Sequence, residues 1–124
     1  MDEATLKALQ TDRIVDITTT GKQSGESRRI EIALIALKDG FYISGRPGRP
    51  RSWYANMRSH PEFTLHVKRS LQADLPASAT PILDPAERRA IFEAMKAADA
   101  TRAEMDVDTW VNESPLVRLT FLER

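Results

Sequence analysis

Short β-prone segments separated by glycine and proline turns restrict this chain to a small number of folds. Four such segments, rich in β-branched or alternating apolar residues, are predicted as strands: residues 13–20, 28–37, 41–45 and 62–68. Gly21 ends the first of them, and Asp39-Gly40 predicts a hairpin turn between the second and the third. Short strands joined by tight turns indicate a mainly β domain.

Helices interrupt the predicted strands. Asp84 is followed by Pro85 and Glu87, and this order of a capping residue, a first proline and an early glutamate predicts a helix over residues 85–98. Three shorter helices are expected, over residues 2–10, 51–59 and 106–113.

Two more strands, over residues 71–83 and 116–122, complete the pattern. Pro76 and Pro81 lie within the first of them, and because proline has no backbone N–H to donate, that strand is expected at a sheet edge or a bulge. The chain contains no internal repeat, and its length of 124 residues suits one domain, which is expected over residues 1–124. About six strands with three or four short helices favour a small barrel or an α+β sheet.

Composition excludes several classes of protein. The hydrophobic fraction of 41% excludes a disordered chain. No apolar run approaches the roughly 18 residues of a membrane-spanning helix, so no membrane span is expected. Cysteine is absent, which excludes disulfides and thiolate metal sites. The acidic N-terminal segment lacks the apolar core of a signal peptide, so a cytoplasmic protein is expected.

The net charge is zero, but the cations are unevenly placed. Residues 21–58 contain eight Lys or Arg and only three Asp or Glu. A neutral chain with one basic segment lacks the broad positive field of a nucleic-acid-binding protein. The segment RPGRPR, residues 46–51, is similar to the arginine hooks that enter DNA minor grooves, yet without overall charge no nucleic-acid partner is expected. The basic segment better suits a single anionic small molecule.

Two parts of this basic segment are candidate binding elements. In the polar turn Gly21–Ser27, the glycines allow backbone N–H groups to converge, and Lys22 and Arg28 flank the turn and could hold a phosphate or carboxylate. Further along, the predicted strand ends in Ser44-Gly45, where a flat ligand could approach the backbone, and arginines follow that could neutralise an anionic tail. The alternatives are a solvated hairpin and a rigid charged surface loop.

No side-chain catalytic machinery is evident. His60 and His66 have no acidic partner at metal-ligand spacing, so no metal site is expected. His66 falls on the strand face opposite the apolar residues, where it is expected to be exposed. Nucleophile-elbow, phosphate-loop and dinucleotide motifs are absent, so no catalytic side chain is assigned. A binding surface without such groups suits an enzyme whose cofactor supplies the reactivity.

The order of the motifs resembles the deazaflavin-dependent nitroreductase family. The matching segments are Ile17–Gly25, Arg28, Ser44-Gly45, Trp53–Met57, His60–Glu62 and Ser114–Leu119. Each motif is weak, but their order and spacing over about half the chain are specific. The resemblance implies a split β-barrel like that of the FMN-binding pyridoxamine-phosphate oxidases. It also implies a reductase that uses the 8-hydroxy-5-deazaflavin coenzyme F420 to pass hydride to a small planar acceptor, a quinone or a nitro compound.

By motif position, the resemblance assigns cofactor-binding roles. The phosphate or glutamate tail would be held by Lys22, Ser24, Gly25 and Arg28. The deazaflavin ring would be lined by Ser44, Gly45 and Arg46, and the pocket would be closed by Ser52, Trp53 and Tyr54. Hydride transfer would then depend on positioning of the cofactor and the acceptor.

The chain also departs from the family pattern. The turn Gly21–Gly25 carries one charge fewer than the family's Gly-Arg-Lys-Ser-Gly, and Glu31-Ile32 replaces Pro-Leu. Residues 105–110 contain no tyrosine beside the substrate pocket, where Trp110 would narrow or close the space. Two alternatives therefore stay open: an oxidoreductase that binds FMN, and a non-catalytic protein that binds a flavin or another anionic ligand. A monomer and a homodimer are both compatible with the sequence.

Overall fold

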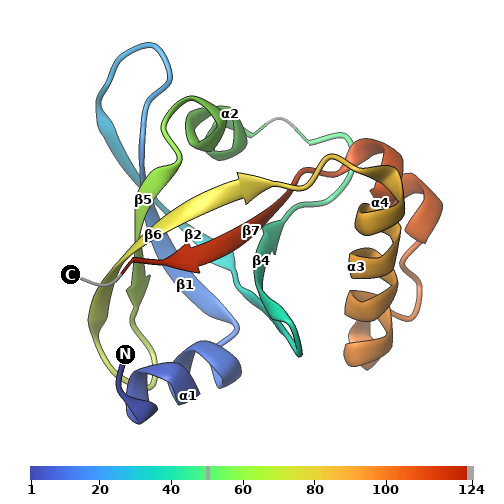
Figure 1. Ribbon diagram of the computed structural model, residues 1–124, viewed down its shortest axis with the longest axis horizontal. Coiled ribbons are helices and arrows are strands. Elements are labelled where there is room, and N and C mark those ends of the chain that lie inside the picture. Colours follow the sequence, from blue (N-terminus) through green and yellow to red (C-terminus); the bar gives the residue numbers. More distant parts are fainter. Residues whose placement is uncertain (50, 123–124) are drawn as a thin grey trace.

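The computed structural model describes residues 1–49 and 51–122, and Pro50 of the predicted loop lies outside them. One antiparallel sheet lies beside a group of helices (Figure 1). Within the described residues, seven strands follow the order β2-β1-β5-β6-β7-β4-β3. The strands are β1 (Ile14–Thr20), β2 (Ser27–Ala33), β3 (Ile35–Leu37), β4 (Gly40–Ser44), β5 (Glu62–Val67), β6 (Ala73–Pro81) and β7 (Leu116–Phe121). The mainly β prediction is confirmed, with one strand more than expected.

The additional strand arises because the apolar segment 28–37 divides at Leu34. β2 and β3, on either side of Leu34, lie at opposite edges of the sheet. Leu34 is 4% exposed, and its N–H donates to the carbonyl oxygen of Arg13 at 2.9 Å. The chain thus passes from one sheet edge to the other at one buried residue, and the sheet curls into a half-open barrel (Figure 1). The prediction of one strand over residues 28–37 was wrong, because a continuous apolar segment does not show whether it forms one strand or two consecutive strands.

Alternation along the strands fills the barrel. The residues of β1 and β5 that point inward are buried, as a period of two predicts: Val15, Ile17, Phe63, Leu65 and Val67. Helix α2 (Ser52–Ser59) adds Trp53 and Met57 to the same core. Trp53, to which the resemblance assigned a place at the pocket, thus packs in the core.

The other helices are α1 (Glu3–Thr11), α3 (Pro85–Ala98) and α4 (Val107–Glu113), with the 3₁₀ turn η1 (Ala100–Arg102) between the last two. The predicted cap of α3 is confirmed, because the Asp84 carboxylate accepts from the N–H of Glu87 at 2.9 Å. η1 was not predicted. In the described part of the chain, no helix is long and apolar enough to cross a membrane.

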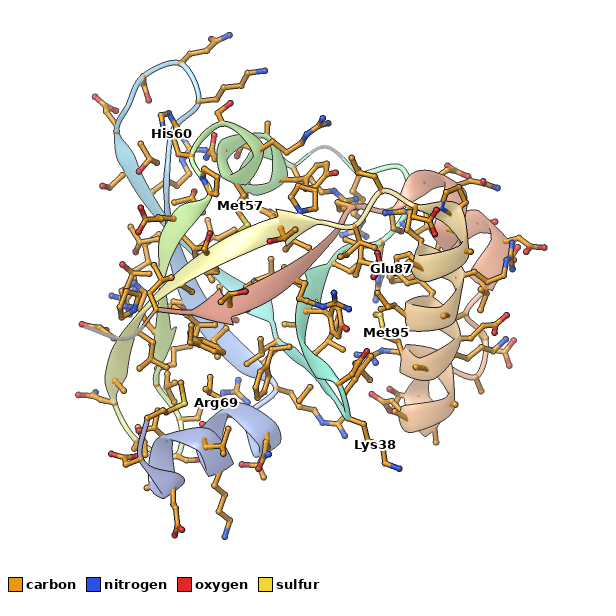
Figure 2. All side chains as sticks on the ribbon, in the orientation of Figure 1. Lys38, Met57, His60, Arg69, Glu87 and Met95 are labelled. Atoms are coloured by element: carbon orange, nitrogen blue, oxygen red, sulfur yellow. The ribbon has the colours of Figure 1, made fainter. Side chains whose placement is uncertain are left out.

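A second core lies between α3 and the β3–β4 edge of the sheet. Phe92 and Met95 of α3 are buried together with Tyr42 of β4 and Leu116 of β7. Figure 2 shows Met95 pointing from α3 toward the sheet. α4 contributes Val111 to this cluster, so both C-terminal helices are attached to one side of the barrel.

The two prolines of β6 lie in a central strand, so the prediction of a sheet edge or bulge was wrong. β6 extends beyond both neighbours and pairs with β5 over its first six residues and with β7 over its last five. The carbonyl of Pro76 accepts from the N–H of Leu122 at 2.9 Å, one residue past the end of β7. Pro81 is the last residue of β6 and has no partner in β5. Proline is tolerated where a neighbouring strand has ended.

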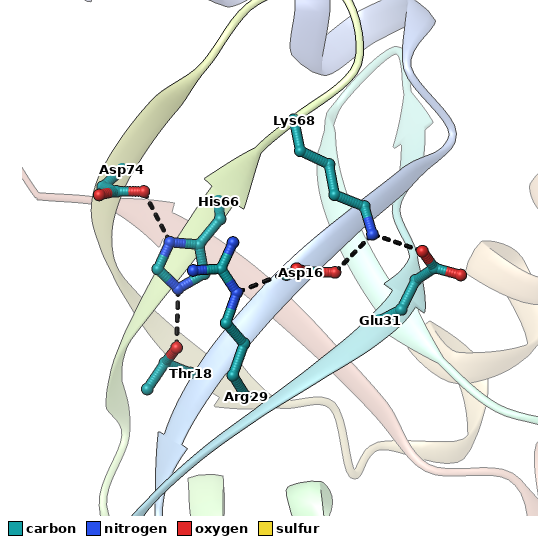
Figure 3. Close-up of polar contacts among 7 residues, drawn as sticks. All are labelled: Asp16, Thr18, Arg29, Glu31, His66, Lys68 and Asp74. Atoms are coloured by element: carbon teal, nitrogen blue, oxygen red, sulfur yellow. Dashed lines mark hydrogen bonds and ion pairs between the residues drawn. The ribbon is translucent and has the colours of Figure 1, made fainter.

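A polar network covers the outer face of β1, β5 and β6 (Figure 3). The sequence predicts an exposed His66, but its side chain is only 10% exposed, so that prediction was wrong. His66 Nε2 lies 2.7 Å from Thr18 Oγ1, and His66 Nδ1 lies 2.7 Å from Asp74 Oδ1. These partners come from adjacent strands, and their proximity cannot be read from one segment alone.

An ionic cluster continues this network (Figure 3). The Asp16 carboxylate accepts from Lys68 Nζ at 2.7 Å and from Arg29 Nε at 2.9 Å, and Lys68 also pairs with Glu31. The hydrogen bond from Lys68, followed by that from Arg29, holds the pKa of Asp16 below its ordinary value. The same bond to Asp16 raises the pKa of Lys68.

Replacing Asp16 with Asn should destabilise the protein at neutral pH, and the loss should shrink in acid. Because the pKa of Asp16 is lower in the folded state, its stabilising contribution is present above the unfolded pKa of about 4. That contribution is lost as the pH falls through the folded pKa. Urea unfolding of both proteins between about pH 7 and pH 3 measures the difference, with exposed Glu93→Gln as control. A difference that does not change with pH would contradict this account.

Candidate functional site

The turn between β1 and β2 is closed by its own hydrogen bonds. The N–H of Gly21 donates to the carbonyl of Glu26 at 2.8 Å, and the N–H of Gly25 donates to the carbonyl of Gly21 at 3.0 Å. The Ser24 hydroxyl accepts from the N–H of Glu26 at 3.1 Å. A Cβ at position 21 would lie 2.5 Å from Ser24 Oγ, so a side chain there would displace the Ser24 hydroxyl. Gly25 has a φ of 71°, which glycine adopts without strain.

Buried Asn56 of α2 connects this turn to the barrel. Its side-chain oxygen accepts from the backbone N–H of Lys22 at 2.9 Å, and its amide nitrogen donates to Thr19 Oγ1 at 3.1 Å. Asn56 is 6% exposed. Asn56 was given no role from the sequence, although Trp53, Asn56 and Met57 share one helix face by their spacing. A polar residue on an otherwise apolar buried face was the available signal.

A cavity of about 430 Å³, here called the loop cavity, lies between the β1–β2 turn and α2. Its lining brings together four residues that the sequence assigned to cofactor binding: Lys22, Ser24, Arg28 and Ser52. Glu26 is the one carboxylate in that lining. Arg51 precedes α2 and its side chain forms no cap hydrogen bond, and Ser52, the first residue of the helix, lines the cavity. Two cations beside an uncapped helix start fit a phosphate or a carboxylate.

A larger cavity of about 770 Å³, here called the arginine cavity, lies where β4 ends and faces η1 and α4. The three residues that the resemblance assigned to the deazaflavin ring line this cavity together: Ser44, Gly45 and Arg46. Its apolar wall includes Met105 and Trp110, and so Trp110 narrows the space without closing it.

The loop that follows β4 is folded around Arg51. Arg51 Nε donates to the carbonyl of Arg49 at 2.8 Å, and Arg51 Nη2 donates to the carbonyl of Arg46. Burial, with a smaller effect of the neighbouring Arg49 charge, lowers the pKa of Arg51. A Cβ at Gly45 would lie 2.0 Å from Arg51 Nη1, so the guanidinium covers the backbone where the sequence predicts a flat ligand. The Ser44 hydroxyl donates to the carbonyl of Pro115 at 2.6 Å.

The structure does not bring Trp53 and Tyr54 to the same place as Ser52. Trp53 is 7% exposed and packs in the barrel core. Tyr54 lines a third cavity of about 480 Å³, together with Arg51 and the buried Arg88. Gly25 lies in the exposed turn. The cofactor-binding roles of these residues stay predictions. Over residues 1–49 and 51–122, no group of three or more side chains could hold a metal ion.

Comparison with known proteins gives one family and one fold. Residues 3–113 match the family model described as F420H(2)-dependent quinone reductase. No curated protein matches the sequence. A solved FAD-binding protein from Mesorhizobium loti superposes with a TM-score of 0.72 at 10% identity, covering 99% of this chain and 91% of that one.

Two further solved structures have higher identity to this chain. One, described as an F420-H2 dependent reductase, has a TM-score of 0.62 at 23% identity and covers 87% of this chain and 94% of its own. The other, described as a domain-swapped dimer, has a TM-score of 0.61 at 22% identity and covers 95% of both chains. At these identities the superpositions show similarity of fold and nothing further, and they confirm the predicted split β-barrel.

Replacing Asn56 with Ala should lower the free energy of unfolding by about 1–3 kcal/mol, because Thr19 Oγ1 and the Lys22 N–H lose their buried partner. Urea unfolding measures the change, with Asn112→Ala on the exposed side of α4 as the matched control. Equal effects of the two substitutions would show that the Asn56 link does not stabilise the turn.

Proposed function

The chain belongs to the F420H(2)-dependent quinone reductase family, an oxidoreductase family that uses reduced F420, and on this premise we propose that it passes hydride from reduced F420 to a small planar acceptor, a quinone or a nitro compound. Membership of an enzyme family favours this activity over the non-catalytic alternative. The specific acceptor and the residues that hold the cofactor are part of the proposal.

The loop cavity is the observation that supports the proposal most strongly. F420 carries a phosphate, and this cavity combines Lys22 and Arg28 with the uncapped start of α2. Ser24 and Ser52 add hydroxyl groups to the same lining. Asn56 holds the backbone of the turn at Lys22 against α2, so the turn between the two cationic residues is positioned before a ligand arrives. We assign the phosphate to this cavity.

The arginine cavity supports placement of the ring on the other side of the loop that follows β4. Ser44, Gly45 and Arg46 offer polar groups beside an apolar wall of Met105 and Trp110. The hydrogen bond from Ser44 to Pro115 fixes the hydroxyl, whose oxygen can still accept. The apolar wall provides a surface on which a flat donor and a flat acceptor would meet.

The chemistry that reduced F420 supplies is donation of a hydride, and a quinone that gains this hydride and one proton from water becomes a quinol. The chain itself contributes binding and orientation. Lys22 and Arg28 balance anionic charge, and Met105 and Trp110 provide a surface for flat molecules. In this account no side chain forms a covalent bond to the substrate.

FMN is the second cofactor candidate, because its phosphate would suit the same cationic lining. One structural neighbour is described as FAD-binding, which makes a flavin compatible with the fold.

We also propose a homodimer, an assembly supported by the neighbour described as a domain-swapped dimer. Light scattering would separate a dimer from a monomer of 14.0 kDa. A cytoplasmic location stays a prediction.

Replacing Arg28 with Ala should weaken F420 binding by about 1.5–3 kcal/mol, the scale of a charge-assisted hydrogen bond. Fluorescence titration of purified protein with F420, and separately with FMN, measures both affinities. Arg69→Ala, an exposed arginine in the β5–β6 connection, is the matched control. Unchanged F420 affinity in the Arg28 variant would remove this residue from the site, and tighter binding of FMN than of F420 would favour the flavin.

A further inference from the structure

The arginine cavity carries more positive charge than a neutral acceptor requires. Arg46 and Arg49 of the loop after β4 line it from one side, and Arg102 of η1 lines it from the other. Glu104 is the one carboxylate in its lining. Within the described residues, none of the three arginines forms an ion pair with a carboxylate. The lining therefore has an excess of two positive charges, and Asp99, whose pKa is lowered by hydrogen bonds from Thr101 and further by the Arg102 charge, lies outside this lining.

Arg102 is the best fixed of these three cations. It is half-buried, and its Nη1 donates to the carbonyl of Met95 at the end of α3 at 3.3 Å. The carboxylate of Asp99 is engaged elsewhere, since it accepts from the backbone and hydroxyl of Thr101 at 2.9 and 2.7 Å and pairs with Arg13 at 2.7 Å. Asp99 thus leaves the guanidinium of Arg102 without a direct carboxylate partner.

The wall of the cavity between these cations is apolar and partly aromatic. Ile35, Met95 and Met105 are buried and line it. Trp110 also lines it and is held in an edge-to-face contact with Phe92, with ring centroids 5.8 Å apart. A flat apolar body suits this wall, and an anionic substituent suits the arginines around it.

Resting on the proposed function, we propose that the physiological acceptor is a planar quinone that carries an anionic substituent, and that Arg102 is the residue that selects for this charge. The loop cavity already provides Lys22 and Arg28 for the phosphate of the cofactor. Within the arginine cavity, the residues proposed for the ring come from β4 and the loop after it, whereas Arg102 comes from η1, which leaves this cation for a second, anionic molecule. The acceptor gains the hydride and one proton from water, and its anionic group does not take part in the reaction.

The test compares two acceptors of similar size and shape that differ in charge: anthraquinone-2-sulfonate and the neutral anthraquinone-2-sulfonamide. Binding to cofactor-free protein is followed by quenching of Trp110 fluorescence, with a Trp110→Phe variant to identify the signal of Trp53. The sulfonate should bind about tenfold more tightly than the sulfonamide at low ionic strength, and high salt should reduce the difference. Turnover with reduced F420 should show the same preference in kcat/KM.

Arg102→Gln should weaken sulfonate binding by about five- to tenfold and leave sulfonamide binding unchanged. Arg69→Gln is the matched control, because Figure 2 places Arg69 beside α1, away from α3 and η1. Equal affinities of the two quinones for the unmodified protein, or equal effects of the two arginine substitutions, would overturn the proposal.

Binding and turnover separate this inference from the function on which it rests. Preferential binding of the sulfonate that depends on Arg102, with no F420-dependent turnover, would support the charge selection and overturn the proposed hydride transfer. F420-dependent reduction of both quinones with equal kcat/KM would support the hydride transfer and overturn the charge selection.

Discussion

The rest of the structure depends on one constraint: at Leu34 the chain passes from one edge of the sheet to the other. Leu34 is buried and bonded to Arg13, and it places β2 and β3 at opposite edges of one sheet. Ala33 and Ile35, its two neighbours, both line the arginine cavity. The residue that joins the two sheet edges thus also fixes part of the cavity wall, and the second core attaches α3 and α4 beside it.

Two cavities of different character follow from this arrangement. The loop cavity is small, polar and cationic, whereas the arginine cavity is larger and combines apolar walls with charged residues. α2 and its preceding loop separate them, and Arg51 ties that loop together through the carbonyls of Arg46 and Arg49. A cofactor with an anionic tail and a planar ring matches this division, since each part meets the surface that suits it.

Local signals predicted the elements that depend on local interactions. The cap of α3 at Asp84 was predictable because its partner Glu87 lies three positions away. The hydrogen bond that holds the β1–β2 turn against α2, from the Lys22 N–H to Asn56, joins residues 34 positions apart and has no such local signal. The division at Leu34 and the burial of His66 depend on strands distant in sequence. Ser52, Trp53 and Tyr54 were assigned to one pocket, but consecutive residues of a helix point in different directions, and the structure separates them.

The central claim is that one F420 molecule contacts both the loop cavity and the arginine cavity. Hydrogen–deuterium exchange of the protein with and without saturating F420 tests it most directly. The account predicts slower exchange in both residues 21–28 and residues 44–49, with little change in the β5–β6 connection at the far end of the barrel. Protection of only one of these two segments, or protection confined to other parts of the chain, would contradict it.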